Sequence, residues 1–86
     1  MLVTNRNGAF SLTFQNPLVT PLNKANALEF AHSNLPFLYF LDLVDGKQDF
    51  GFFWEFKFWQ PANGTLVQVE VDKDGTDITV KIIEVV

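Results

Sequence analysis

Residues 50–59 read Phe-Gly-Phe-Phe-Trp-Glu-Phe-Lys-Phe-Trp, and their alternation decides the fold. Every even position from 50 to 58 is aromatic, whereas the odd positions are Gly51, Phe53, Glu55, Lys57 and Trp59. Successive side chains of a β-strand point to opposite faces of its sheet. The segment therefore predicts a strand with one wholly aromatic core face and a second face that mixes aromatic and charged residues.

The composition predicts one domain, residues 1–86, with a rich core. Hydrophobic residues make up 48% of the 86, and ten are Phe. The chain has no Cys, which excludes disulfides and thiolate metal sites and, in so small a domain, favours the cytoplasm. No signal peptide is expected, and no run approaches the roughly 20 apolar residues of a membrane span. A net charge of −4 with six scattered Lys and Arg argues against nucleic acid as a partner.

Three dipeptides predict the turns of a four-stranded meander in the C-terminal half: Gly46-Lys47, Asn63-Gly64 and Asp74-Gly75. In the resulting registers every core residue meets another: Phe37 pairs with Phe56, Leu43 with Phe50, Phe58 with Val69, and Val71 with Ile78. A slip by one residue would turn each apolar set to the wrong face, so this agreement supports the meander. A four-residue loop over 61–64 would keep the faces and change only the partners.

The first third of the chain predicts a hairpin and a helix. Residues Leu2–Asn5 and Ala9–Gln15 flank a turn at Asn7-Gly8. A helix is expected over Leu22–Ser33, capped by Thr20 with Pro21 at its first position. The predicted fold is therefore α+β, in the order ββαββββ, with a mostly antiparallel sheet or half-open small barrel.

No residue pattern predicts a catalytic centre, a cofactor or a metal site. His32 is the only histidine, and its place near a helix end fits a solvated side chain that interacts with the helix dipole. Glu70, Asp72 and Asp74 have the spacing of a calcium loop, but Lys81 stands where the bidentate Glu should be. The chain is therefore expected not to be an enzyme.

The predicted registers also gather residues on a second face of the sheet. Its apolar members are Leu38, Phe40, Phe53, Trp59, Leu66, Ile83 and Val85, and its polar members are Asp42, Glu55, Lys57, Gln68, Glu70 and Lys81, with Lys57 opposite Glu70. Left bare, this apolar surface would exceed the few hundred Å² usual for a soluble monomer. The face is therefore expected to be covered by the chain itself, by a second copy, or by a foreign protein or sugar.

These patterns favour a non-enzymatic interaction module that self-associates or docks on a larger protein. The expected contact residues are Phe40, Phe53, Glu55, Lys57, Trp59, Leu66 and Ile83. Phe53 and Trp59 would be the anchors, because aromatic side chains dominate binding energy at interfaces, and Glu55 and Lys57 would set the orientation. The alternative is a small-molecule binder, for example of sugars, or a minor enzyme with a pocket between helix and sheet lined by His32, Tyr39 and Trp54.

Overall fold

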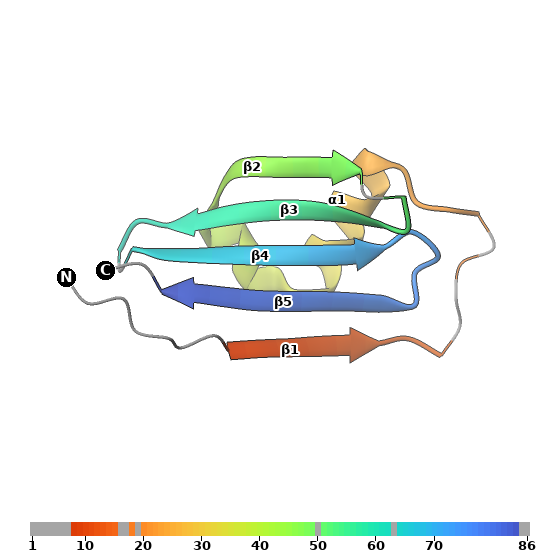
Figure 1. Ribbon diagram of the computed structural model, residues 1–86, viewed down its shortest axis with the longest axis horizontal. Helices are drawn as coiled ribbons and strands as arrows, with labels where there is room; N and C mark the ends of the chain where they lie inside the picture. The colour runs from red at the N-terminus through yellow and green to blue at the C-terminus, as the bar shows by residue number, and fades with distance from the viewer. Residues whose placement is uncertain (1–7, 16–17, 19, 50, 63, 85–86) are drawn as a thin grey trace.

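The computed structural model describes residues 8–15, 18, 20–49, 51–62 and 64–84. These residues form a five-stranded antiparallel sheet with one α-helix on one of its faces (Figure 1). In chain order the elements are β1 (Gly8–Thr13), α1 (Lys24–Asn34), the 3₁₀ helix η1 (Pro36–Phe40), β2 (Asp42–Asp49), β3 (Phe53–Gln60), β4 (Thr65–Asp72) and β5 (Asp77–Glu84). The strand order across the sheet is β1-β5-β4-β3-β2, and the sheet is not closed. The predicted α+β class is confirmed; the strand expected at residues 2–5 lies outside the described residues.

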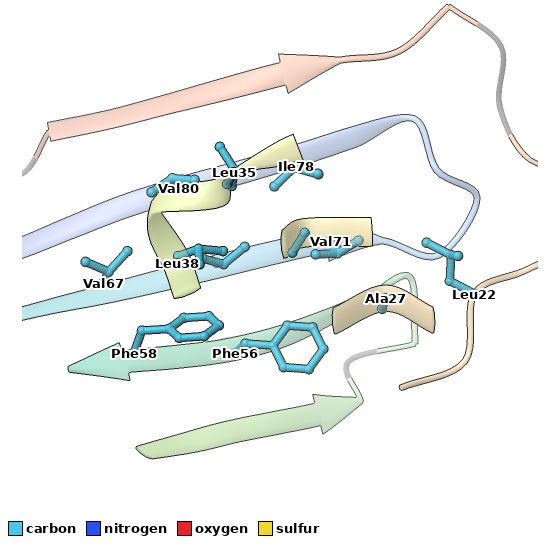
Figure 2. Packing of buried hydrophobic residues seen from close by; sticks show 12 residues of the cluster. Leu22, Ala27, Leu35, Leu38, Phe56, Phe58, Val67, Val71, Ile78 and Val80 are labelled. Carbon is cyan, nitrogen blue, oxygen red and sulfur yellow. The ribbon is translucent and has the colours of Figure 1, made fainter. Parts of the chain in front are cut away.

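The core lies between α1 and the aromatic face of β3. Phe56 and Phe58 are 0% and 1% exposed, and burying one such side chain contributes about 1.5–3 kcal/mol. The other buried apolar side chains come from the helical layer and from the neighbouring strands β4 and β5 (Figure 2): Leu22, Ala27, Ala31, Leu35, Leu38, Val67, Val69, Val71, Ile78 and Val80. The alternation that predicted the core face of β3 is therefore confirmed at its centre.

Helix α1 lies close to the sheet because the residues it buries are small. Ala27 and Ala31, one turn apart, are both fully buried. The N-cap is Asn23, whose side-chain oxygen accepts a hydrogen bond from the Asn26 amide at 2.8 Å. The prediction that Thr20 caps the helix is therefore wrong. Asn23 is the cap, and the helix begins about one turn later than expected.

The segment after α1 is a 3₁₀ helix where the sequence predicted a strand. Pro36 fits the first turn of η1, because its fixed φ suits a helical start. Residues three apart lie on one side of a 3₁₀ helix, and Leu35 and Leu38 both enter the core, with Leu41 packed against it. The expected pairing of Phe37 with Phe56 is therefore wrong, and Leu38 is a core residue.

The turn between β2 and β3 is also displaced from its predicted position. Gly46 lies inside β2 between two irregularities of its register with β3, where Gly is common, so Gly46-Lys47 is not the turn. Leu43 pairs with Phe58 instead of Phe50, which itself lies outside the described residues. Phe52, expected in the core, belongs to the turn and is 86% exposed.

The other two hairpins have the predicted faces. In β4 and β5, Val71 pairs with Ile78 and Val69 with Val80, as expected. Between β3 and β4 the last pair is Gln60 with Thr65, which corresponds to the four-residue loop considered as the alternative. Phe58 consequently pairs with Val67 rather than Val69, and the core face is unchanged.

Strand β1 joins the sheet beside β5, and the chain then follows the β4–β5 turn toward α1. Backbone bonds run from Phe14 N to Thr76 O at 2.7 Å, from Leu18 N to Asp74 O at 2.7 Å, and from Leu22 N to Lys73 O at 2.8 Å. The Trp54 indole N–H donates to the Leu22 carbonyl at 3.0 Å. These bonds fix the segment that leads into α1 beside the start of β3.

Replacing Gly75 by Ala should destabilise the fold more than the same change at Gly51. Both glycines have positive φ, +75° and +90°, which costs an L-residue about 1–2 kcal/mol. A Cβ at Gly75 would lie 2.8 Å from Leu18 Cγ, whereas a Cβ at Gly51 would meet nothing within 4 Å. Displacing Leu18 should add about 1 kcal/mol to the loss in unfolding free energy, measured by urea denaturation.

The matched comparison isolates the contact with Leu18 from the backbone cost. Gly75→Ala combined with Leu18→Ala should recover the additional loss. Equal losses for Gly75→Ala and Gly51→Ala would contradict the close packing of Leu18 on the β4–β5 turn.

Candidate functional site

The face of the sheet opposite α1 gathers most of the predicted contact residues. We define this open face by ten residues of the three central strands: Phe53, Glu55, Lys57, Trp59, Leu66, Gln68, Glu70, Thr79, Lys81 and Ile83. In Figure 1 it is turned toward the viewer, and α1 lies behind the sheet. In the described part of the chain, no helix covers it.

One row of the open face is apolar. Trp59 pairs with Leu66, and Leu66 pairs with Ile83, so the three side chains lie side by side across β3, β4 and β5. All three are half-buried. Asp42 of β2 pairs with Trp59 and ends the row on that side. The row provides a continuous apolar strip that crosses the strands near one end of the sheet.

The centre of the open face is a charged network. Lys57 Nζ lies 3.8 Å from Glu55 Oε1, and Lys81 Nζ lies 3.4 Å from Glu70 Oε2. Gln68 donates a hydrogen bond to the same Glu70 oxygen at 2.9 Å. The pair of Lys81 with Glu70 is partly exposed and contributes little stability, so it matters chiefly for the charge pattern that it presents.

Glu55 is the most buried charged residue of the open face. The residue is 8% exposed, although no described layer covers this side of the sheet. Its neighbours on the face therefore provide the cover, and the Lys57 ammonium supplies the opposite charge that a buried carboxylate requires.

Six of the seven predicted contact residues lie together on the open face, and Phe40 does not. Phe40 ends η1, in the helical layer, and is 86% exposed. The strand expected over these residues would have placed Phe40 opposite Phe53, and this placement is wrong because η1 replaces that strand. The predicted pairing of Lys57 with Glu70 is also wrong, since Lys57 pairs with Gln68 and Glu55 with Glu70. Val85 lies outside the described residues.

The sequence prediction missed a second group of exposed aromatic residues. Phe37, Tyr39 and Phe40 of η1 are 40%, 68% and 86% exposed. The signal that could have identified them is the three-residue spacing of Leu35, Leu38 and Leu41, which turns these aromatic residues away from the core.

The alternative pocket between helix and sheet does not bring its three residues together. The His32 ring lies 4.4 Å from the Tyr39 ring and 5.7 Å from the Phe58 ring, and His32 Nδ1 lies 2.9 Å from the Leu28 carbonyl oxygen. Trp54 is on the same face of β3 as Phe58 but four residues away, about 13 Å along the strand. Trp54 instead donates to the carbonyl of Leu22, which precedes α1, and Lys73 Nζ lies 4.7 Å from its ring centre.

The turn between β4 and β5 holds the remaining cluster of acidic residues. Asp74 accepts hydrogen bonds from the Thr76 hydroxyl and amide, which lower the pKa of Asp74. The pKa of Asp72 is raised, chiefly by burial and further by the charges of nearby acids, against a hydrogen bond from Thr76. A shallow hollow of about 370 Å³ beside this turn is lined by Pro21, Gly51, Phe52, Asp72, Lys73 and Asp74.

Neither a metal centre nor a membrane span is found in the part of the chain that the structure describes. No three His, Cys, Asp or Glu side chains among these residues are placed to hold a metal ion. The helices of the same residues lack the length and apolar character needed to cross a bilayer.

Comparison with known proteins gives no assignment. No family model, curated protein or solved structure matches the chain significantly. The open face is therefore the feature from which a function can be inferred.

Replacing Thr76 by Val should raise the pKa of Asp74. Because the folded-state pKa of Asp74 is depressed, its interactions stabilise the fold above the unfolded value of about 3.9 and are lost as the pH falls through the folded pKa. Asp72 has the opposite sign, since its raised pKa disfavours the ionised form in the folded state. An NMR titration of the Asp74 carboxyl carbon measures the shift.

Thr76→Ser is the matched control, because it keeps the hydroxyl that donates to Asp74. The Ser variant should titrate like the natural chain. If the Val variant also does so, the hydrogen bond from the Thr76 hydroxyl is not the cause of the depressed pKa of Asp74.

Proposed function

We propose that the chain is a non-enzymatic interaction module that binds a protein surface, either a second copy or a larger protein, through its open face. The observation that carries this proposal is the one-sided helical layer. It buries one face of the sheet and leaves the row Trp59, Leu66 and Ile83 on a face that no described element covers. An apolar strip beside charged groups resembles the core and rim of a protein interface.

The size of the face indicates what a partner must contact. The three strands that carry the open face are each eight residues long and lie about 4.8 Å apart, which gives this face a flat area of roughly 400 Å². A specific interface buries about 800 Å² on each partner. The apolar row alone is therefore too small, and a stable partner must also cover the charged centre.

The charged centre then determines which partner fits. Glu55 and Lys57 adjoin each other on β3, and Glu70 and Lys81 do so across β4 and β5. A partner that places a carboxylate over the lysines and an ammonium or guanidinium over the carboxylates would satisfy both. Trp59 and Phe53 would act as anchors at opposite ends, so the apolar contacts supply affinity and the charges supply orientation.

The proposal assigns no catalytic residue and places the chain in the cytoplasm. The absence of Cys from a small domain supports that location. A small-molecule site between helix and sheet is not proposed, because Trp54 lies about 13 Å along β3 from Phe58, whose ring His32 contacts.

A photo-cross-linking residue in place of Gln68 should capture the partner, whereas the same residue in place of Phe40 should not. Gln68 lies at the centre of the open face, and Phe40 is an exposed aromatic residue outside it. In cells that make the chain, the mass of the cross-linked product distinguishes a second copy from a larger protein. Trp59→Ser or Lys57→Glu in the same chain should abolish the product from position 68.

Circular dichroism of both variants separates loss of binding from loss of fold. A product from position 40 that Trp59→Ser leaves unchanged would move the interface to η1. No product from position 68, or one that persists in both variants, would contradict the proposal.

A further inference from the structure

The two edges of the sheet differ in how they are protected against pairing with another strand. The sequence of β2, Asp-Leu-Val-Asp-Gly-Lys-Gln-Asp, contains four charged residues, and its register with β3 is irregular at two places. Charges and bulges are the features that prevent an edge strand from accepting a further strand. The β2 edge is therefore protected.

The β1 edge has neither feature. Its sequence, Gly-Ala-Phe-Ser-Leu-Thr, has no charge and no Pro, and its register with β5 is unbroken from Gly8 with Ile82 to Thr13 with Asp77. Among the described residues, no strand lies on its outer side. This edge is regular and can accept another strand.

The backbone of β1 presents its outward hydrogen-bonding groups at alternate residues. Phe14 N donates to Thr76 O at 2.7 Å, which continues the β1–β5 register and directs the amides of the even residues toward β5. In an antiparallel ladder the bonding side alternates with each residue. The N–H and C=O groups of Ala9, Ser11 and Thr13 therefore point to the outer edge.

The apolar side chains of β1 are incompletely covered by the chain itself. Phe10 is 42% exposed, and Leu12 is only half-buried. Helix α1 packs over β3 and β4. In Figure 1, β1 is the strand that lies farthest from α1. A sheet extended past β1 would cover both side chains.

We propose that β1 pairs with β1 of a second copy, antiparallel, about a two-fold axis that passes through Ser11 perpendicular to the sheet. In this register Ser11 meets its own copy and Ala9 meets Thr13, so each of the three outward-facing residues exchanges two backbone bonds. Phe10 meets Leu12 of the copy on the core side. An axis at Phe10 would pair Leu12 with Gly8 instead and leave fewer outward groups bonded.

Charge favours the β1 edge over the β2 edge for pairing between two copies. The chain carries −4, so two copies repel each other wherever their acidic residues meet. Pairing through β2 would bring Asp42, Asp45 and Asp49 of both copies to one interface, whereas pairing through β1 brings none. The two-fold axis leaves both open faces on the same side of one continuous sheet, and the edge contact is independent of the open face.

The test uses Ala9 and Thr13, which are exposed and whose neighbours on β5 are Lys81 and Asp77. Ala9→Glu with Thr13→Glu opposes like charges across the axis at two symmetric places and should weaken dimerisation by about tenfold. Ala9→Glu with Thr13→Lys has the same bulk, opposes unlike charges and suits both β5 neighbours, so its dimer should be at least as tight as the natural one. Sedimentation over a concentration series measures the dissociation constants.

Two further measurements, the salt dependence of dimerisation and the melting temperature, distinguish charge repulsion from a loss of fold. High salt should narrow the difference between the two double variants, and their melting temperatures at low concentration show whether β1 remains in the sheet. A natural chain that stays monomeric throughout, or dimerisation that does not distinguish the two variants, would overturn the proposal. Trp59→Ser should leave this dimer unchanged. A failure of β1 pairing can therefore be distinguished from a failure of open-face binding.

Discussion

The structure depends on one constraint: a strand directs alternate side chains to opposite faces, and the described residues supply one α-helix to cover two faces. On β3, Phe56 and Phe58 point to α1, and Glu55 and Lys57 point away from it. The helical layer supplies the small side chains Ala27 and Ala31 and the large ones Leu35 and Leu38 to one face. Among the described residues, the opposite face is consequently built from neighbours on the sheet, and Glu55 is buried there.

The same constraint explains what sequence reasoning could predict. Where the turns are short and the alternation is strict, as at Val71 with Ile78, the faces and the partners both follow from the pattern. Six contact residues of the open face follow from the same alternation in β3, β4 and β5. Between β3 and β4 the sequence predicted the faces but not the partners. A longer loop shifts each partner by two residues, and the same side chains still point to the core.

The errors have two local causes and one global cause. Residues 36–40 alternate well enough for a strand, but Pro36 and the spacing of Leu35, Leu38 and Leu41 satisfy a 3₁₀ helix, and burial of Leu38 decides between them. Gly46 suits a turn and a bulge equally, so the turn and the register of β2 with β3 were predicted wrongly. The pairing of β1 with β5 joins distant parts of the sequence and has no local signal.

The open face and the β1 edge are two surfaces that the helical layer leaves uncovered, and they present different chemistry. The face offers side chains, with an apolar row beside charges, whereas the edge offers backbone groups between uncharged side chains. A dimer through the edge would place two open faces side by side, which would enlarge the surface available to a partner and allow it to bind at two points.

The central claim is that one face of the sheet is solvent-facing in the free chain, and paramagnetic broadening of methyl signals by a soluble gadolinium chelate tests it most directly. In a dilute sample the methyl groups of Leu66 and Ile83 should broaden strongly, and those of the fully buried Val69 and Val80 should not. If Leu66 and Ile83 are instead protected as well as Val69, the chain itself covers this face, and the account of its function is wrong.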